Sequence, residues 1–377
     1  MRKKGFQQSI YITTNVSCNL NCIYCYENKT SKETFDVEMA KKSLSELLSV
    51  KTEKGTIIDL HGGEPFMVFE KIKELCEWLW SQNFPEKFLV FATSNGTLVH
   101  GKIKKWLTEH SDKFIVGLSI DGTREMHNTN RSNSFDLIDI DFFVTTWSFQ
   151  AVKMTISPKT IDKLAEGIIF LHSKGIKDIR ANLAYMVDWS NPQYIEIYQR
   201  EMQKLAVFYK KNPTLTKSSI FDINLIAFAN KENQSKKWCG AGTEIVAYDI
   251  DGRVYPCHLF FESICGKEKS KNANNIDFAD PNEFTSKECS DCPILTICPT
   301  CYGSNYIERG KIGSRDMSLC KMNKIRVFEI AKYEYDRIVN DKTDLQNMSD
   351  EEKFKRIKTL DAIEALFPFF NKFDDCL

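Results

Sequence analysis

Strand-like segments alternate with helical segments through the first 210 residues of the chain. The strand-like segments are rich in Val, Ile, Phe and Leu and show little polar alternation, which is typical of parallel strands covered on both faces. We expect strands at 9–13, 56–60, 88–93, 114–120, 151–156 and 178–184. Helical patterns lie at 36–49, 69–81, 100–110, 135–149, 161–173 and 192–210. These six strand–helix units predict an α/β domain with a parallel sheet, and they are too few for a closed eight-stranded barrel.

Three cysteines lie in one short loop directly after the first predicted strand. Cys18, Cys22 and Cys25 have the spacing C-x3-C-x2-C. Thiolates are soft ligands that suit an iron–sulfur cluster or zinc. Three thiolates are one fewer than a [4Fe–4S] cluster needs, so one iron would stay open to a small molecule. Zinc is the alternative, but no His occurs between residues 1 and 60, so its fourth ligand would come from far along the chain.

Composition excludes several classes of protein. The chain has 51 Lys and Arg and 51 Asp and Glu, and this zero net charge argues against a nucleic-acid binder. It contains no apolar run long enough for a transmembrane helix, and its basic N-terminus lacks the apolar segment of a signal peptide. We therefore expect a cytoplasmic protein without a membrane partner. In that compartment, thirteen cysteines indicate metal ligands more than disulfides.

The segment His61-Gly62-Gly63-Glu64-Pro65 follows the second predicted strand. Together with the C-x3-C-x2-C loop, this segment resembles the radical SAM superfamily. In that family the open iron chelates S-adenosylmethionine, and one-electron cleavage gives a 5′-deoxyadenosyl radical that abstracts hydrogen from the substrate. The resemblance implies a partial (β/α)6 TIM-like barrel, with its reactive groups at the C-terminal ends of the strands. It also implies an electron donor of the flavodoxin or ferredoxin type.

The same resemblance implies a set of residues that bind S-adenosylmethionine. They are Tyr24 beside adenine, Gly63 and Glu64 at the ammonium group, Ser94 and Asn95 at the ribose, Ser119 and Arg131 at the carboxylate and ribose, and Leu183 at adenine. The guanidinium of Arg131 suits a carboxylate because it can donate two parallel hydrogen bonds. A surface ion pair for Arg131 and a plain core position for Leu183 are the alternatives.

Cysteines become dense after about residue 235, where the periodic patterns end. Their spacing resembles the SPASM domain, a C-terminal extension of radical SAM enzymes that act on peptides and proteins. The resemblance implies two auxiliary clusters, and hence three [4Fe–4S] clusters in all. One would be held by Cys289, Cys292, Cys298 and Cys320, and the other by Cys239, Cys257 and Cys301, with Cys265 or a substrate thiol as the fourth ligand.

One spacing departs from the SPASM pattern, because two residues separate Cys298 from Cys301 where the family has three. The placement of Cys301 is therefore less secure than that of the other cysteines. Two structural zinc sites are the alternative, since C-x2-C pairs are also typical of zinc ribbons.

We expect three parts: a radical SAM core at 1–234, an auxiliary-cluster domain at 235–325 and a helical segment at 326–377. Within the second part, 266–275 has the composition of a solvated loop. Within the third, Ser349 and Glu352 have the spacing of a capping box that opens a helix toward residue 365.

The leading functional hypothesis is a maturase that forms a carbon–sulfur or carbon–carbon crosslink in a ribosomally made peptide. The first strand is expected by about residue 9, so a separate protein or the C-terminal helices would recognise the leader of such a peptide. The second hypothesis is an anaerobic sulfatase-maturating enzyme, which makes formylglycine. That branch has an Asp after the cysteine that corresponds to Cys257, whereas His258 stands here, as a weak candidate for a catalytic base.

A third hypothesis belongs to another class: a non-catalytic or regulatory iron–sulfur protein that keeps the fold. It predicts that the residues contacting S-adenosylmethionine are lost. The sequence retains them, which favours an enzyme.

Overall fold

A computed structural model describes residues 8–29, 31–229, 237–340 and 348–370. Its contacts divide the chain into two compact units. The first unit contains the residues up to 155 together with 170–179 and 240–280. The second contains 156–169, 180–239 and the residues from 281 onward. The division into 1–234, 235–325 and 326–377 stays a prediction.

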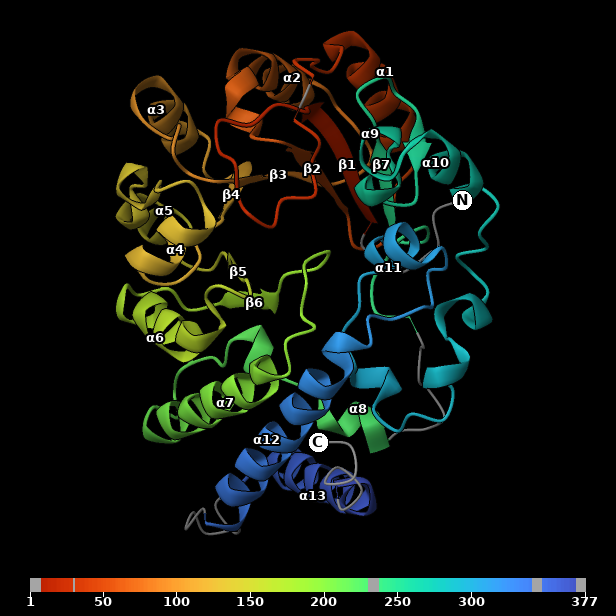
Figure 1. Ribbon diagram of the computed structural model, residues 1–377. Coiled ribbons are helices and arrows are strands. Elements are labelled where there is room, and N and C mark those ends of the chain that lie inside the picture. Colours follow the sequence, from red (N-terminus) through yellow and green to blue (C-terminus); the bar gives the residue numbers. More distant parts are fainter. Residues whose placement is uncertain (1–7, 30, 230–236, 341–347, 371–377) are drawn as a thin grey trace. The chain divides into compact units, whose positions relative to one another are not determined.

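A six-stranded sheet forms the centre of the first unit, in the order β4-β3-β2-β1-β7-β8 (Figure 1). Its strands are β1 (Gln8–Asn15), β2 (Thr56–Gly62), β3 (Phe88–Ser94), β4 (Phe114–Leu118), β7 (Ile245–Tyr248) and β8 (Val254–Tyr255). All neighbours pair in parallel except β7 and β8, which form an antiparallel ladder. Ile10 of β1 lies opposite Ile58 and Val246, so β7 extends the sheet beside its first strand. The sequence patterns did not predict β7 or β8.

The fifth and sixth predicted strands also form. β5 (Val152–Ile156) and β6 (Ile179–Leu183) make a separate two-stranded sheet. An isolated parallel bridge between Ser119 and Lys153 links the end of β4 to β5. The predicted α/β class with a parallel sheet is therefore confirmed, and the described strands do not close into a barrel.

Amphipathic helices connect the parallel strands. α1 (Val37–Leu48), α2 (Phe69–Ser81) and α3 (Gly101–Glu109) lie on one face of the sheet in Figure 1. Each begins within two residues of its predicted start. Asp36 caps α1 by accepting a hydrogen bond from the N–H of Met39 at 3.0 Å, as an N-cap carboxylate should. Buried leucines on α1 and α2 then seal the apolar face of the sheet.

Three segments differ from the prediction. The helix expected at 135–149 is shorter and forms as α5 (Ile140–Thr146). It begins late because Asp139 is its N-cap and accepts a hydrogen bond from the N–H of Phe142. A helix that was not expected, α4 (Arg124–Asn130), precedes it. The segment 266–275 is mostly not a loop, since α10 (Lys267–Ala273) is helical there, directly after α9 (Glu262–Cys265), and Ala273 is buried.

The second unit is mainly helical. Its helices include α6 (Leu164–Ser173), most of which lies in this unit, α7 (Gln193–Lys211), α8 (Leu225–Ala229), α11 (Tyr302–Arg309), α12 (Ser318–Val339) and α13 (Asp350–Phe370). One apolar core joins Leu225, Ile294, Ile297, Val327, Ala331, Ala362, Ile363 and Leu366. The predicted capping box of α13 is confirmed: Glu352 accepts from the N–H of Ser349 at 2.9 Å, and its own N–H donates to the Ser349 hydroxyl at 3.3 Å.

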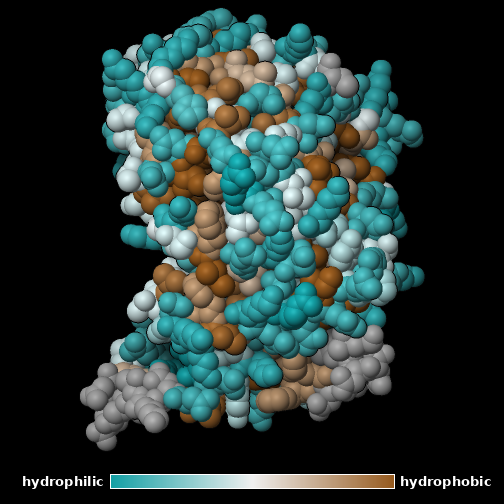
Figure 2. Space-filling view, turned by 60° about the vertical axis from the view of Figure 1, so that its left-hand side comes forward, coloured by the Kyte–Doolittle hydropathy of each residue, from teal (hydrophilic) through white to brown (hydrophobic). Residues whose placement is uncertain are grey.

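Hydrophilic side chains are interspersed with hydrophobic ones over the face shown in Figure 2. Among the helices of the described ranges, none combines the length and the apolar character that crossing a bilayer requires.

Candidate functional site

The cysteine loop after β1 is tied by its backbone to the end of β2. The N–H of Gly63 donates to the carbonyl of Asn15 at 3.0 Å, and the N–H of Glu64 donates to the carbonyl of Ser17 at 3.0 Å. A Cβ on Gly63 would lie 2.0 Å from the Ser17 oxygen, so only glycine permits this approach. The resemblance assigned Gly63 to the cofactor. In the structure its missing side chain makes room for the cysteine loop, and its N–H already has a partner.

Gly63→Ala is therefore expected to displace the cysteine loop. The clash is with backbone, which cannot move aside as a side chain could, and we expect a loss of at least about 3 kcal/mol in unfolding free energy, as for other severe steric substitutions. Iron incorporation into the loop should fall with it. Thermal unfolding and iron analysis check this result, with Gly310→Asn as the control because a Cβ there meets open space and Asn tolerates its left-handed backbone. Equal stability of the two variants would contradict the expectation.

The three thiols of the loop lie in different surroundings. Cys18 and Cys22 are partly buried, whereas Cys25 is exposed. The sulfur of Cys18 accepts from the N–H of Leu20 at 3.4 Å and from the amide of Asn95 at 3.9 Å. Burial raises the pKa of Cys18 to about 11 and also raises the pKa of Cys22. A thiolate at these positions needs a compensating cation, which a bound iron would provide.

Glu64, Ser94 and Asn95 meet beside this loop at the C-terminal ends of β2 and β3. The Glu64 carboxylate is 1% exposed and accepts from the Ser94 hydroxyl at 2.9 Å and from the N–H of Asn95 at 2.8 Å. It also accepts from the N–H of Phe66 at 3.2 Å. Burial raises the pKa of Glu64 to about 7, although these donors oppose the rise. The structure thus groups three residues of the predicted cofactor set, and their contact with S-adenosylmethionine stays a prediction.

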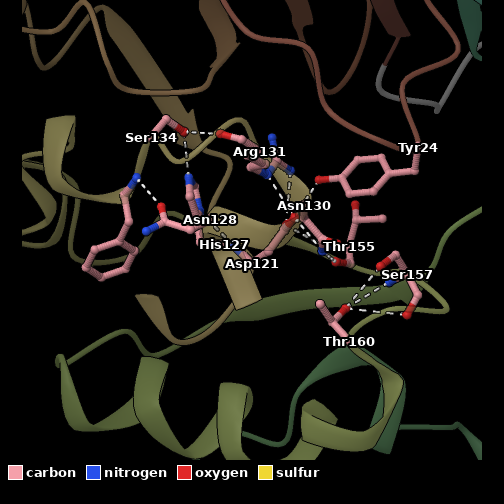
Figure 3. A network of polar contacts seen from close by, with 11 residues as sticks. Tyr24, Asp121, His127, Asn128, Asn130, Arg131, Ser134, Thr155, Ser157 and Thr160 are labelled. Atoms are coloured by element: carbon pink, nitrogen blue, oxygen red, sulfur yellow. Dashed lines mark hydrogen bonds and ion pairs between the residues drawn. The ribbon is translucent and has the colours of Figure 1, made fainter. Parts of the chain in front are cut away.

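Arg131 and Tyr24 also belong to the predicted set, and the structure joins them through Asp121 (Figure 3). The Nε of Arg131 lies 2.9 Å from one carboxylate oxygen of Asp121, and its Nη2 donates to the other at 3.1 Å. The hydroxyl of Tyr24 donates to Asp121 at 2.6 Å, and the guanidinium lies 5.4 Å from the Tyr24 ring centre. Asp121 is fully buried and Arg131 is 7% exposed. Arg131 is therefore not the surface ion pair considered as its alternative.

Asp121 is a site residue that the sequence reasoning missed. It also accepts from the N–H of Thr155 at 2.9 Å and from the side-chain amide of Asn130 at 3.1 Å. The carbonyl of Asn130 in turn accepts from the N–H of Ile23, inside the cysteine loop, at 3.0 Å. The network therefore fixes the loop against the end of α4. The only available signal was the position of Asp121 directly after the fourth strand.

Ser119 is also buried, at 7% exposure, and its N–H donates to the carbonyl of Ser94 at 2.9 Å. The ends of β3 and β4 are thus held together where the predicted ribose and carboxylate contacts lie. The charge of Arg131 acts on the Cys22 thiol and opposes the rise of its pKa. This ion-pair network therefore connects the cofactor residues to the cluster loop electrostatically as well as by hydrogen bonds.

His258, the weak candidate for a base, lies in a cluster of aromatic and imidazole rings. One of its ring nitrogens is 2.9 Å from the Tyr26 hydroxyl, and its ring centre is 4.3 Å from that of His61. Glu27 approaches His61 to 3.7 Å. Burial lowers the pKa of His258 to about 4 and that of His61 well below its usual value, so both rings are neutral at pH 7. A pKa this low makes the His258 ring a weak base near neutral pH, and its catalytic role stays a prediction.

Asp59 of β2 is a buried carboxyl near this cluster, and it predicts a pH dependence of stability. Burial raises its pKa from 3.8 to about 6. Between these values the folded chain keeps a proton that the unfolded chain has released, so stability falls as pH rises through this window, by about 3 kcal/mol in total. Asp59→Asn should remove that fall. Unfolding free energies measured from pH 4 to pH 7.5 check it, and identical pH profiles for the two proteins would contradict it.

Four of the C-terminal cysteines line one cavity in the second unit. They are Cys289, Cys292, Cys298 and Cys320, the set predicted for one auxiliary cluster. The cavity is also lined by Arg315, whose buried Nε has no hydrogen-bond partner among the described residues. Four thiols beside an unpaired buried cation fit a negatively charged tetrathiolate group such as a [4Fe–4S] cluster.

The other predicted set is distributed over both units. Cys239 and Cys301 line a second cavity of the second unit, together with Leu183. Cys257 precedes the 3-10 turn His258–Phe260 in the first unit. Cys265, the possible fourth ligand, is buried in the first unit, and its thiol donates to the carbonyl of Phe260 at 3.4 Å. The composition of this cluster site stays a prediction.

Within the described ranges, no group of three or more His, Cys, Asp or Glu side chains is placed to hold a single metal ion. A [4Fe–4S] cluster offers a separate iron to each thiolate, so its ligands stand further apart than those of one zinc ion.

Known families and structures agree with an iron–sulfur protein. Residues 4–137 match the family described as a 4Fe-4S single cluster domain. The solved structure of anSMEcpe with bound AdoMet is 20% identical, with a TM-score of 0.64 over 88% of this chain and 98% of that one. SuiB from Streptococcus suis bound to its precursor peptide SuiA is 15% identical, with a TM-score of 0.55 over 83% and 76%. At these identities the likeness concerns the fold.

Three curated relatives extend the comparison. An uncharacterized protein of Methanocaldococcus jannaschii is 27% identical over 48% of this chain and 63% of its own length, which is less than two thirds of that relative. A cysteine-type anaerobic sulfatase-maturating enzyme of Clostridium perfringens is 23% identical over 74% and 84%. The subtilosin biosynthesis protein AlbA of Bacillus subtilis is 24% identical over 79% and 68%. These findings confirm the predicted resemblance to radical SAM iron–sulfur enzymes.

Proposed function

We propose that the chain is a radical SAM maturase that forms an oxidative crosslink, a thioether or a carbon–carbon bond, in a ribosomally made peptide. The observation that carries this proposal is the grouping of the cysteine loop with Glu64, Ser94 and Asn95 at the C-terminal ends of parallel strands. Ligand sites of parallel α/β folds lie at that edge of the sheet. The relationship to AlbA and the fold likeness to SuiB with its precursor peptide support a peptide substrate.

Each part of the first unit has a role in this proposal. Cys18, Cys22 and Cys25 would hold the cluster, which with S-adenosylmethionine supplies the radical that takes hydrogen from a carbon. Glu64 is placed to accept from a cationic group close to the loop. The buried pair of Asp121 and Arg131 would hold the loop in place through the hydrogen bond of Asp121 to Tyr24.

The second unit would contribute the oxidising capacity that a crosslink requires. Joining a thiol to a carbon removes two hydrogen atoms, and hence two electrons, from the peptide. The cavity of Cys289, Cys292, Cys298 and Cys320 and the pair of Cys239 and Cys301 are the groups that would hold auxiliary clusters. A soluble electron donor and a separate protein for recognising the leader of the peptide complete the proposed partners.

The experiment that tests this function uses the chain reconstituted anaerobically with iron and sulfide, then incubated with S-adenosylmethionine and dithionite. Candidate substrates are short cysteine-containing peptides encoded next to its gene. We expect a product that has lost two hydrogen atoms. A thiol that no longer reacts with an alkylating agent would identify the thioether, and a thiol that still reacts would identify the carbon–carbon bond. A product of unchanged mass with an inverted stereocentre would overturn the crosslinking reaction.

Formylglycine formation is the second candidate, favoured by the extent of the relationship to the sulfatase-maturating enzyme, which spans 84% of that protein. His258 would then stand where that branch has an Asp, with a ring nitrogen 2.9 Å from the Tyr26 hydroxyl; its lowered pKa means that bound substrate would have to raise its basicity for it to act as the base. A sulfatase active-site peptide that gains a carbonyl reactive toward hydrazides would favour this candidate over the crosslink.

A further inference from the structure

Arg315 occupies an unusual position in the second unit. It is 8% exposed and lines the cavity formed by Cys289, Cys292, Cys298 and Cys320. Its Nη1 donates to the carbonyl of Cys298 at 2.7 Å, and its Nε is buried without a partner among the described residues. An unpaired buried donor costs about 1–3 kcal/mol, and more when the group is charged. A buried cation in this state indicates an acceptor that the protein itself does not supply.

The loop that carries Arg315 is held in place on both sides. Nε of Arg309 donates to the carbonyl of Ser314 at 2.8 Å, and Asn305 donates to the carbonyl of Ile312 at 2.8 Å. On the other side Asp316 accepts from the N–H of Ser318 at 3.0 Å, where α12 begins. The direction of the guanidinium is thus fixed before any ligand binds, which is typical of a preorganised site.

The charge of the cavity matches this cation. Among the residues that line it, Arg315 is the only basic one, and the carboxylate of Asp316 accepts from the N–H and the hydroxyl of Ser318. Four thiolates on a [4Fe–4S] cluster leave the complex with net negative charge, which grows by one on reduction. A fixed positive charge beside it stabilises the reduced form more than the oxidised form.

We infer that Arg315 is the charge-compensating residue of the auxiliary cluster at Cys289, Cys292, Cys298 and Cys320, and that it raises the reduction potential of that cluster. Its Nε–H would be free to donate to the cluster, while Nη1 donates to the carbonyl of Cys298. This inference rests on the iron–sulfur part of the proposed function and goes beyond it, since it assigns an electron-accepting bias to one particular cluster. It makes that cluster a better acceptor for an electron leaving the substrate.

The test uses the full chain reconstituted with iron and sulfide, without substrate. Arg315→Gln removes the charge, Arg315→Lys keeps it, and Lys311→Gln removes the same charge at an exposed position of the same loop. Redox titration followed by electron paramagnetic resonance gives the midpoint potential of the cluster whose signal is absent from Cys292→Ala. We expect Arg315→Gln to lower the equilibrium constant for reduction of this cluster by about tenfold. For one electron, this corresponds to a midpoint potential that is about 59 mV lower. Arg315→Lys should keep most of the wild-type potential, and Lys311→Gln all of it.

Several outcomes would overturn the inference. An unchanged potential in Arg315→Gln with full iron content would show that the charge does not act on the cluster. Equal loss of the cluster from both Arg315 variants would show a packing role, and zinc in place of iron at these cysteines would remove the redox role. Loss of this cluster from Arg315→Gln alone, with Arg315→Lys intact, would support charge compensation at assembly. None of these measurements requires cleavage of S-adenosylmethionine, so they fail or succeed independently of the proposed reaction.

Discussion

Cys22→Ala is expected to abolish the formation of 5′-deoxyadenosine. Cys22 is one of three thiols in the loop, and the segment 15–26 contains no fourth sulfur-bearing side chain that could replace it. Two thiolates cannot hold a [4Fe–4S] cluster, so the loop should lose its iron while the clusters of the C-terminal cysteines remain. Iron and sulfide per chain, together with chromatography of the nucleoside products after incubation with S-adenosylmethionine and dithionite, measure both effects.

The matched control is Cys76→Ala. Cys76 is fully buried in α2, away from every predicted cluster motif. We expect it to keep wild-type iron content and wild-type product formation, with a loss of about 1 kcal/mol of stability for a small cavity. Wild-type yields of 5′-deoxyadenosine from Cys22→Ala would contradict the assignment of the loop and favour a non-catalytic iron–sulfur protein.

Asp121→Asn should have the largest effect on stability. Removing the carboxylate charge leaves the guanidinium of Arg131 buried without a counter-ion, which typically costs about 3–5 kcal/mol. The substitution also weakens the hydrogen bonds from Tyr24 and Thr155, so the cysteine loop should lose iron more readily. Denaturant unfolding and the rate of iron release to a chelator measure the two consequences.

Two further variants distinguish the stability effect of breaking the buried Asp121–Arg131 pair from the effect of removing any carboxylate charge. Asp136→Asn breaks the exposed ion pair with Arg124 and should change stability little, because surface pairs are well solvated. Adding Arg131→Met to Asp121→Asn removes the unpaired cation and should recover part of the lost stability. The account fails at this point if Asp121→Asn is as stable as Asp136→Asn.

The sequence patterns predicted the elements of the parallel sheet well, for a physical reason. Strands covered on both faces are continuous apolar runs, and the amphipathic helices between them have clear caps such as Asp36. β7 was missed because it has only four residues and is stabilised by pairing with β1, which lies more than 200 residues earlier in the chain. No local pattern encodes such a pairing.

The site shows the same division between local motifs and contacts across the chain. The resemblance to the SPASM domain implied the four cysteines that line one cavity, whereas their local spacing alone would have grouped Cys301 with Cys289, Cys292 and Cys298. Asp121 and Arg315 were missed because single charged residues carry no periodic signal. Their burial becomes evident only when Tyr24 and Arg131, or the four thiols, come together in space. Gly63 was found from its motif, but the group that it accommodates, the carbonyl of Ser17, could be identified only from the fold.

In the proposed function, a radical formed at the cysteine loop takes hydrogen from a peptide carbon. Its most direct test is transfer of deuterium from a peptide substrate, labelled at the carbon that becomes modified, into 5′-deoxyadenosine. We expect a nucleoside that carries deuterium in proportion to the modified peptide, and no labelled nucleoside when Cys22→Ala is used. Modified peptide formed alongside 5′-deoxyadenosine that contains no deuterium would contradict it.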